Sequence, residues 1–313
     1  MRRACEWAPG DVSVSTRGRR SRVERSEESG PRQVSLARLA EFGIHPKRGL
    51  GQNFLIDDNI LGVILAQLEC KPQDVVLEVG AGLGVLTAAL VQQALHVHAF
   101  EVDRSLEPAL RATLGEEAPV SLHFEDVLEA RLEDLEPPPT LCASNLPYQV
   151  AGAFIIEAVQ RLPGIRRYCL MVQREVADRM AAPPGSKVYG LLSVWVQLYT
   201  RVAHVRPLSR TIFYPQPHVD SSLIVLERRS LEELPAVSAQ ALRATLQAAF
   251  GQRRKTLSNA LVGGLGLPRA AAEEALAAVG LAATVRAEQV SPPQLAALAL
   301  HLGTQVAGER DGS

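Results

Sequence analysis

Short apolar runs alternate with stretches of helical spacing from Val75 onwards. Five of the runs have the length and composition of strands, and they span residues 75–79, 96–101, 120–124, 141–144 and 168–172. Between them, apolar residues recur three or four positions apart, as in a helix that packs one face on a core. Strands that alternate with helices are typical of βαβ units, so the pattern predicts an α/β domain built on a mostly parallel sheet.

The pattern changes after the fifth run. Two further extended runs, at residues 200–205 and 221–227, could close the sheet as a hairpin-like pair. Beyond Leu234, Ala and Leu recur at helical spacing, with breaks at residues 263–266 and at Pro292. This last part of the chain predicts a small C-terminal domain that is all-helical.

The two ends of the chain lack such periodicity. The first 35 residues hold many Arg, Glu and Ser and no apolar stretch of the kind that a secretory signal requires. We expect residues 1–35 to be a disordered extension and residues 306–313 a disordered tail; for the extension, a basic arm that touches RNA is the alternative. The α/β domain then covers residues 36–230 and the helical domain residues 231–305.

Composition narrows the classes of function. With 33 Lys and Arg against 34 Asp and Glu, the chain has no general positive charge that attracts nucleic acid, so any RNA contact must come from local patches. No apolar run approaches the roughly 20 residues that span a bilayer, and we expect no membrane contact. The cysteines form no C-x-x-C pair, and His96 and His98 have no further ligand nearby, so we expect a reduced cytoplasmic location and no metal site.

Three glycines, Gly80, Gly82 and Gly84, directly follow the first strand and precede a helix. A turn of this kind lets a ligand approach bare backbone at the end of a sheet, which favours a nucleotide-like ligand over a plain tight turn. The dinucleotide fingerprint G-x-G-x-x-G would need a small residue at Val85, so the spacing argues against a nicotinamide oxidoreductase.

Acidic residues stand at the ends of the next two strands. Glu101 follows the glycine loop at about the distance from which a carboxylate can accept hydrogen bonds from ribose hydroxyls. Asp126 comes just after the third strand, where it could accept a hydrogen bond from an adenine amino group. Each acid alone would be read as a solvated loop residue, but their placement at successive strand ends predicts one shared crevice.

The fourth strand ends in Asn145-Leu146-Pro147-Tyr148, which is the strongest signal in the chain. The lone pair of an adenine amino nitrogen is delocalised into the ring and must be freed before the nitrogen attacks a methyl sulfonium. The Asn145 side-chain oxygen and the Leu146 carbonyl could each accept one amino hydrogen, which stabilises the charge that develops on the nitrogen. A strand-to-helix turn without chemistry is the less favoured alternative.

The other two residues of this tetrapeptide fit the same role. Pro147 biases Leu146 towards an extended conformation, which would aim the Leu146 carbonyl at the base. Tyr148 offers an aromatic face for stacking, typically worth about 1 to 3 kcal/mol per base. Because the adenine must leave its stack to enter, the pattern predicts a flipped or single-stranded RNA target. No general base is needed, since the proton is acidic once the nitrogen is methylated.

With these motifs in place, the chain resembles the KsgA-type ribosomal RNA adenine dimethyltransferases over residues 36–302. The resemblance is specific because nine motifs occur in order. They are GLGQNFL at 49–55, LEVGAGLGVLT at 77–87, FEVD at 100–103, DVL at 126–128, NLPY at 145–148, VQREVADRM at 172–180, YGLLSV at 189–194, FYPQPHVDSSLIVL at 213–226 and FGQRRKTLSNAL at 250–261.

The resemblance implies a class I methyltransferase fold, Rossmann-like with a mostly parallel seven-stranded sheet, and a small C-terminal helical domain. It implies S-adenosylmethionine as the cofactor. The implied reaction is dimethylation of the exocyclic N6 of two adjacent adenines in the 3′-terminal hairpin of 16S ribosomal RNA, late in assembly of the small ribosomal subunit. The implied partner is that subunit, and we expect the protein to act as a monomer.

The resemblance also implies roles for individual residues. The implied catalytic residues are Asn145, Leu146, Pro147 and Tyr148. Gln52, Asn53 and Leu55 would cover the cofactor, Gly80 would contact its amino-acid part, Glu101 its ribose and Asp126 its adenine. The complete implied cofactor site is Gln52, Asn53, Leu55, Glu78, Gly80, Gly82, Gly84, Glu101, Val102, Asp126, Val127 and Asn145. Gln149 stands where Asn is frequent in the family, which could tune how easily a monomethylated base re-enters.

Two local basic patches could neutralise RNA phosphates. Arg253, Arg254 and Lys255 lie in a stretch that we expect to be helical, at the start of the C-terminal domain. Lys47 and Arg48 come directly before the motif that covers the cofactor. A solvated helix face is the alternative interpretation of the first patch.

Two other functions remain open on the same fold. One is methylation of a large-subunit adenine, as in macrolide-resistance enzymes, although Leu146 in place of the Ile common there and the segment QRRKTLSNAL argue against it. The other is an assembly or transcription factor that acts mainly by binding. The complete set of cofactor residues argues against a loss of catalysis.

Overall fold

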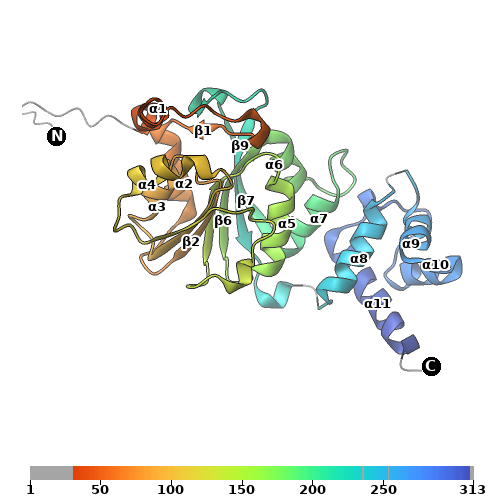
Figure 1. Ribbon diagram of the computed structural model, residues 1–313. Coiled ribbons are helices and arrows are strands. Elements are labelled where there is room, and N and C mark those ends of the chain that lie inside the picture. Colours follow the sequence, from red (N-terminus) through yellow and green to blue (C-terminus); the bar gives the residue numbers. More distant parts are fainter. Residues whose placement is uncertain (1–30, 235, 253, 311–313) are drawn as a thin grey trace, which may run out of the picture.

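The computed structural model describes the backbone of residues 31–310, apart from positions 235 and 253, and the side chains of residues 35–303 apart from the same two. The apolar runs of the sequence form one seven-stranded sheet with the order β4-β3-β2-β5-β6-β9-β7 (Figure 1). Its strands are β2 (Val75–Val79), β3 (His96–Phe100), β4 (Val120–His123), β5 (Leu141–Asn145), β6 (Arg167–Gln173), β7 (Thr200–Leu208) and β9 (Ser221–Arg228).

The direction of the strands confirms the predicted α/β class. The neighbours from β4 through β3, β2 and β5 to β6 all pair in parallel, whereas β9 pairs antiparallel with both β6 and β7. The hairpin-like pair expected at residues 200–205 and 221–227 is therefore present as β7 and β9, and β7 continues to Leu208. Parallel strands place their carboxyl ends at one edge of a sheet, where α/β proteins bind their ligands.

Helices cover both faces of the sheet and continue beyond it. Those that precede or flank the strands are α1 (Pro31–Glu41), α2 (Asp58–Leu68), α3 (Val85–Leu90), α4 (Glu107–Leu114), α5 (Ala151–Arg161), α6 (Arg174–Ala181) and α7 (Leu191–Tyr199). After β9 follow α8 (Ala239–Phe250), α9 (Leu257–Leu265), α10 (Arg269–Ala278) and α11 (Pro292–Arg310). The helical C-terminal part is thus as predicted.

Successive residues of a strand point to opposite faces, so the sheet has two cores. Val76 of β2 belongs to the core beneath α2, α3 and α4, which also contains Ile64 and Leu90. Leu77 belongs to the other core, beneath α5, α6 and α7, together with Phe154. Because both faces of the central strands are buried, these strands appear in the sequence as continuous apolar runs.

Helix α7 joins the sheet to the C-terminal helices. Leu192 and Val196 pack in the core on the sheet, whereas Trp195 and Leu198 pack with the helices α8 to α11. A helix that is buried on opposite sides is apolar nearly all round, which explains the sequence LLSVWVQLY. The domain boundary expected near residue 231 stays a prediction, because the two cores share this helix.

Helices extend into both segments that we expected to be disordered, at residues 31–35 and 306–310. Helix α1 begins at Pro31, and the buried Ser35 hydroxyl donates a hydrogen bond of 2.8 Å to the Leu55 carbonyl, so residues 31–35 are not a disordered segment. Likewise α11 continues to Arg310, through the start of the tail expected from residue 306. Residues 1–30 and 311–313, which make up the rest of the expected extension and tail, lie outside the described part of the chain.

A second, two-stranded sheet was not expected from the sequence. The strands β1 (Phe54–Leu55) and β8 (Phe213–Tyr214) pair antiparallel, with Phe54 opposite Tyr214. The Ile56 N–H extends this pairing through a hydrogen bond of 2.9 Å to the Ile212 carbonyl. The pairing places the N-terminal segment next to the carboxyl ends of the parallel strands.

Three histidines, His96, His98 and His123, lie on the neighbouring strands β3 and β4, where their rings contact each other and polar neighbours. His98 Nε2 is 2.9 Å from the Pro137 carbonyl, and His98 Nδ1 is 3.3 Å from His123 Nε2. His123 in turn stacks on Phe100, with ring centroids 4.4 Å apart. In the described part of the chain, no helix combines the length and the apolar character of a membrane span.

Replacing Gly84 by Ala is expected to lower the free energy of unfolding by about 1 to 3 kcal/mol. Gly84 has a φ of 80°, in the left-handed region, and a Cβ there would lie 2.6 Å from Leu110 Cδ1 on α4. Gly62→Ala in α2 is the matched control, because no atom lies within 4 Å of a Cβ at that position. Urea unfolding followed by circular dichroism compares the two; equal midpoints would contradict the packing described for Gly84.

Candidate active site

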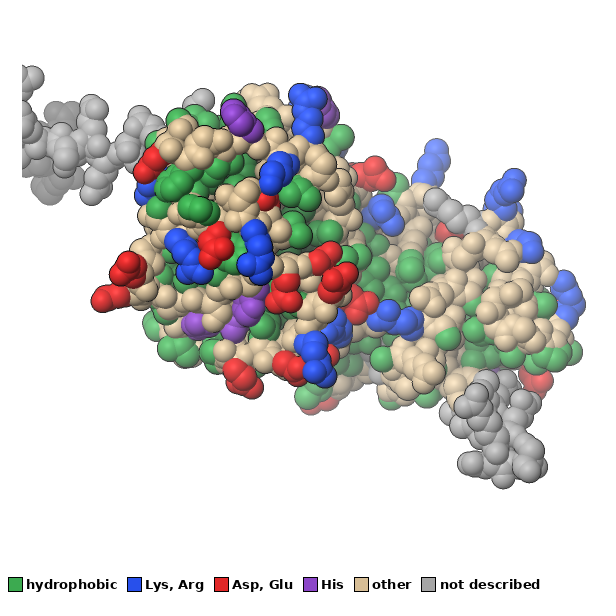
Figure 2. Space-filling view, viewed as in Figure 1, with side chains coloured by type: hydrophobic (Ala, Val, Ile, Leu, Met, Phe, Trp, Pro, Cys, Tyr) green, Lys and Arg blue, Asp and Glu red, His purple; other side chains and the backbone are tan. Residues whose placement is uncertain are grey.

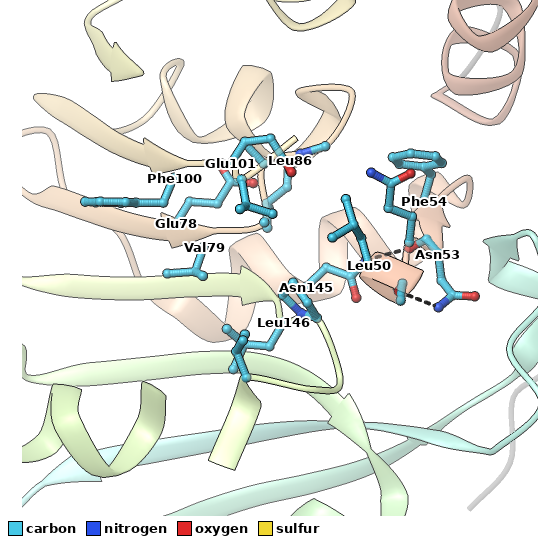
Figure 3. A pocket seen from close by; sticks show the side chains of 18 of the residues that line it. Leu50, Asn53, Phe54, Glu78, Val79, Leu86, Phe100, Glu101, Asn145 and Leu146 are labelled. Atoms are coloured by element: carbon cyan, nitrogen blue, oxygen red, sulfur yellow. Dashed lines mark hydrogen bonds between the residues drawn. The ribbon is translucent and has the colours of Figure 1, made fainter. Parts of the chain in front are cut away.

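A pocket lies at the carboxyl ends of β2, β3 and β5, with residues 50–55 on its opposite side. In Figure 3, Glu78, Glu101 and Asn145 extend from the strand ends, and Leu50 and Asn53 lie across from them. The predicted cofactor residues that line this pocket are Gln52, Asn53, Leu55, Glu78, Gly80, Gly82, Glu101, Val102, Asp126, Val127 and Asn145. Residues that are distant in the sequence thus meet at the carboxyl ends of the parallel strands, where α/β proteins bind their ligands.

Two positions of the loop require glycine, because other residues of the protein approach their backbone closely. Gly80 has a φ of 80°, and a Cβ there would lie 3.0 Å from Pro147 Cδ. Gly82 has a φ of 58°, and its Cβ would lie 3.2 Å from Phe54 Cδ1. Both positions therefore keep the pocket open between its two sides. Gly84, which we predicted to bind the cofactor, instead lies outside the pocket and against Leu110, because it begins α3 where that helix packs on α4.

Glu101 is fixed in the pocket wall by backbone groups. Its Oε2 accepts a hydrogen bond of 2.9 Å from the Gly82 N–H, and its Oε1 accepts one of 2.9 Å from the Asp103 N–H. The side chain is buried, and burial raises the pKa of the carboxyl. Each carboxylate oxygen has a further lone pair, so the fixed group can still accept hydrogen bonds from a ligand diol.

Glu78 is the least satisfied polar group at the pocket. Its residue is 1 % exposed, and among the described residues its Oε2 has no hydrogen-bond partner. Burial, with a further contribution from the negative charge of Glu101, raises the pKa of Glu78 to about 8. A buried carboxyl without a partner is costly, so this atom favours a ligand that brings a hydrogen-bond donor or a positive charge.

Asp126 follows β4 as predicted and faces the pocket from its half-buried position. Its Oδ1 accepts a hydrogen bond of 2.9 Å from the Leu128 N–H, which fixes the turn after the strand. The neighbouring side chains Val102, Val127 and Phe100 line the same wall with apolar surface. Apolar side chains beside a carboxylate acceptor suit an adenine ring with its amino group.

The side chain of Asn145 has a defined orientation. Its Nδ2 donates a hydrogen bond of 2.9 Å to the Asn53 carbonyl, drawn as a dashed line in Figure 3. Since the amide nitrogen is committed as a donor, Oδ1 is the side-chain atom left to act as an acceptor. The next residue, Leu146, is buried, and its N–H donates to the Met171 carbonyl at 3.1 Å, which holds the turn on β6.

Tyr148 stands beside Asn145 with its ring half-buried. Its hydroxyl lies 2.8 Å from Ser221 Oγ on β9, and burial raises the pKa of the phenol. An aromatic ring fixed at its far end keeps one orientation, as a stacking surface requires. The four residues of the predicted catalytic tetrapeptide therefore lie together at one side of the pocket.

The segment before β1 is joined to Asp103 by polar contacts. Lys47, predicted to bind RNA, forms an ion pair of 2.7 Å with the buried Asp103. The Gln52 amide also contacts this network, since its Nε2 donates to Asp103 Oδ2 at 2.8 Å and its Oε1 accepts from the Lys47 N–H at 2.8 Å. The Lys47 side chain is half exposed although it is paired, and among the described residues Arg48 of this patch is exposed without an ion pair.

The described residues of the C-terminal basic patch, Arg254 and Lys255, lie in a turn and not in a helix. Helix α8 ends at Phe250, and α9 begins at Leu257 with Thr256 as its cap. Gly251 is the C-cap of α8, an end that the helical spacing of the sequence did not reveal. Arg254 and Lys255 are exposed in this turn, whereas Arg253 lies outside the described residues.

Several pocket residues were not predicted. Leu50, Phe54, Leu86 and Phe100 line the pocket with apolar surface, and Ser35 reaches it from α1. Phe54 stands in the motif GLGQNFL, so that motif could have indicated it. Ser35 carries no local signal, because its place depends on the packing of α1 against a distant part of the chain.

Comparison with known proteins gives a family match over most of the chain. The family model described as ribosomal RNA adenine dimethylase matches residues 44–301. The chain is 43% identical over 267 residues to the ribosomal RNA small subunit methyltransferase A of Streptomyces coelicolor, covering 84% of this chain and 93% of that one. A protein of the same name from Rubrobacter xylanophilus is 42% identical over 253 residues, covering 81% and 94%.

Solved structures support the same fold. A dimethyladenosine transferase from Plasmodium falciparum superposes with a TM-score of 0.69 at 23% identity, covering 81% of this chain and 98% of that one. The 23S rRNA methyltransferase ErmE superposes with a TM-score of 0.59 at 26% identity, covering 80% and 100%. Both likenesses cover 80% or more of this chain, so the class I methyltransferase fold predicted from the sequence is confirmed.

Glu78→Gln is expected to change how stability depends on pH. The pKa of Glu78 rises from an ordinary 4.5 to about 8 on folding, so the folded state keeps a proton that the unfolded chain has lost. The stabilisation that comes from this retained proton is complete below the pKa of the unfolded chain. It decreases by about 1.4 kcal/mol per pH unit as the pH rises between the two pKa values. Urea unfolding at several pH values measures this effect. The free energy of unfolding of the Gln variant should rise relative to that of the wild type as pH increases. A difference between the two proteins that does not change with pH would contradict the raised pKa of Glu78.

Proposed function

The chain belongs to the ribosomal RNA adenine dimethylase family, and on this premise we propose that it dimethylates the N6 of two adjacent adenines in the 3′-terminal hairpin of 16S ribosomal RNA. We propose that the substrate is the small ribosomal subunit late in its assembly, and that the protein works as a monomer in the cytoplasm. The methyl donor is S-adenosylmethionine, in keeping with the family and with the class I fold.

The residues of the pocket fit this cofactor. The donor presents a ribose diol, an adenine, a sulfonium and an amino-acid end, and it supplies a methyl group on positively charged sulfur. Glu101 would accept from the diol, and Asp126 would accept from the adenine amino group. The unpartnered Glu78 oxygen would face the positively charged part, and Gly80 would admit the amino-acid end close to the backbone.

Asn145 would carry the reaction at the target base. Its Oδ1 would accept one hydrogen of the adenine amino group, and the Leu146 carbonyl would accept the other. Both acceptors oppose delocalisation of the nitrogen lone pair and stabilise the positive charge that develops as the nitrogen is methylated. The proton that leaves the nitrogen is then acidic and can pass to water.

Tyr148 and the turn that holds it would orient the base. Its ring would stack on the adenine, and the contact between its hydroxyl and Ser221 would keep the ring in place. The adenine must be unstacked from its RNA neighbours to reach this surface, so the site requires a flipped base. A second methylation needs the monomethylated base to bind again, with its single remaining hydrogen directed to one of the two acceptors.

The observation that carries the proposal is the hydrogen bond that turns Asn145 Oδ1 away from Asn53. The large-subunit alternative is less favoured, because identity is 26% to ErmE and 43% to the small-subunit enzyme of Streptomyces coelicolor. A factor that acts only by binding would not need the polar atoms of the pocket to be arranged for a cofactor.

Transfer of labelled methyl groups tests this function. Purified protein is incubated with methyl-labelled S-adenosylmethionine and small ribosomal subunits that lack the modification, and the RNA is then digested and mapped by mass spectrometry. The proposal requires label in N6,N6-dimethyladenosine at two adjacent positions. Label in large-subunit RNA alone, or none in adenine, would refute it.

Asn145→Ala is expected to lower the methylation rate by about 100-fold to 1000-fold, the cost typical of a lost acceptor or donor for developing charge. Cofactor affinity should fall much less, because the hydrogen bond at stake forms with the target base. Single-turnover kinetics and calorimetric titration with S-adenosylmethionine separate the two effects. A rate within a few-fold of the wild type would exclude the proposed role of Asn145.

Replacing Arg254 and Lys255 together by Gln is expected to weaken RNA binding and to reduce the slope of log K against log salt by roughly 1.4 to 1.8. Each of these residues would neutralise one phosphate from the turn between α8 and α9. Arg269→Gln is the control, since Arg269 is already paired with Glu273 at 3.2 Å in the same domain. An equal slope for wild type and double variant would place the RNA elsewhere.

A further inference from the structure

Residues 47–53 form a strap that crosses the pocket from one side to the other. The strap begins at the side where β3 ends and reaches the side where β5 ends. It contains a short 3₁₀ turn at Arg48–Leu50, and Gly51 has a φ of 64° that lets the backbone reverse. Gln52 and Asn53, which lie in the strap, line the pocket, so the strap forms its roof.

On one side of the pocket, Lys47 and Gln52 of the strap are bound to Asp103. This carboxylate is 5 % exposed, and it accepts from Lys47 Nζ at 2.7 Å and from Gln52 Nε2 at 2.8 Å. Ser105 Oγ donates to it at 2.6 Å. Burial alone would raise the pKa of Asp103, but the hydrogen bonds of its partners outweigh burial and lower the pKa to about 2. Asp103 is therefore charged at physiological pH and attracts the strap.

On the opposite side, Gly49 and Asn53 of the strap are bound to the tetrapeptide and the residue after it. The Asn53 carbonyl accepts from Asn145 Nδ2 at 2.9 Å, and the Gly49 carbonyl accepts from Gln149 Nε2 at 3.1 Å. Gln149 is the residue at which the chain departs from the Asn frequent in the family. Its longer side chain reaches the strap, so the structure gives this departure a physical role.

We infer that Asp103 and Gln149 are positioning residues that clamp the strap across the cofactor pocket and so couple closure of the pocket to the orientation of Asn145. Asp103 does not line the pocket and would not touch cofactor or base; it acts through Lys47 and Gln52. The strap in turn presents the Asn53 carbonyl, without which the Asn145 amide has no fixed orientation. The inference rests on the proposed function for the identity of the ligand.

Asp103→Asn is the sharpest test of the clamp. The variant has nearly the same shape, but it loses the charge that attracts Lys47, and its amide nitrogen repels the Gln52 donor if it takes the place of Oδ2. Losing hydrogen bonds to a charged group should weaken S-adenosylmethionine binding roughly tenfold and raise amide hydrogen exchange in residues 48–53 by a similar factor. Both quantities are measured without RNA, by calorimetric titration and by mass spectrometry of exchanged peptides.

Gln149→Glu tests the contact between Gln149 and the strap. The substitution keeps the size of the side chain and removes the donor to the Gly49 carbonyl. Exchange in the strap should rise, and kcat for adenine methylation should fall by a larger factor than KM for the cofactor changes, because Asn145 loses its fixed orientation. Gln149 is exposed, so this variant decides the question by itself if Asp103→Asn does not fold.

Glu107→Gln is the control for the change in charge. Glu107 begins α4 and pairs with Arg111 at 2.8 Å, and no hydrogen bond or ion pair among the described residues joins it to the strap. Cofactor affinity and strap exchange should match the wild type in this variant. If both quantities in Asp103→Asn also stay within twofold of the wild type, the clamp is overturned. A wild type that binds cofactor but methylates no adenine would instead contradict the proposed function and leave the clamp standing.

Discussion

The hydrogen bond from Asn145 Nδ2 to the Asn53 carbonyl joins the two parts of the molecule on which the site depends. Asn145 ends a central strand, and Asn53 comes from the N-terminal segment that β1 and β8 hold beside the sheet. Because an amide has one donor end and one acceptor end, this single contact decides which atom is presented to a substrate. The orientation of the proposed catalytic group therefore depends on a segment that is distant from it in the sequence.

Burial gives three carboxyl groups near the pocket different properties. Asp103 has a lowered pKa because basic and polar side chains surround it, and it serves the structure. Glu101 has a raised pKa but accepts two backbone hydrogen bonds, which fix it for a neutral diol. Glu78 Oε2 has no hydrogen-bond partner among the described residues, and burial raises the pKa of this carboxyl to about 8. A pocket of this kind is prepared for a ligand that carries hydroxyls and positive charge together.

Local patterns predicted the sheet and most of the pocket, because strand periodicity and the position of a residue at a strand end are local properties. The run at 75–79 is β2, and Glu101, Asp126 and Asn145 do meet at one edge. Contacts between distant segments could not be predicted in this way. The ion pair between Lys47 and Asp103 is one example, because nothing near Lys47 in the sequence indicates it. Gly84 was predicted to bind the cofactor together with the other two glycines, because the spacing of glycines in the sequence cannot show that α4 packs against Gly84.

The most direct test of the account is a crystal structure of the protein with S-adenosylhomocysteine and adenosine bound. We predict that the adenosine N6 lies within about 3.2 Å of both Asn145 Oδ1 and the Leu146 carbonyl, with the base stacked on Tyr148. The Asn145 amide nitrogen should still donate to the Asn53 carbonyl. An adenosine whose N6 contacts neither acceptor, or an Asn145 side chain turned out of the pocket, would contradict the account.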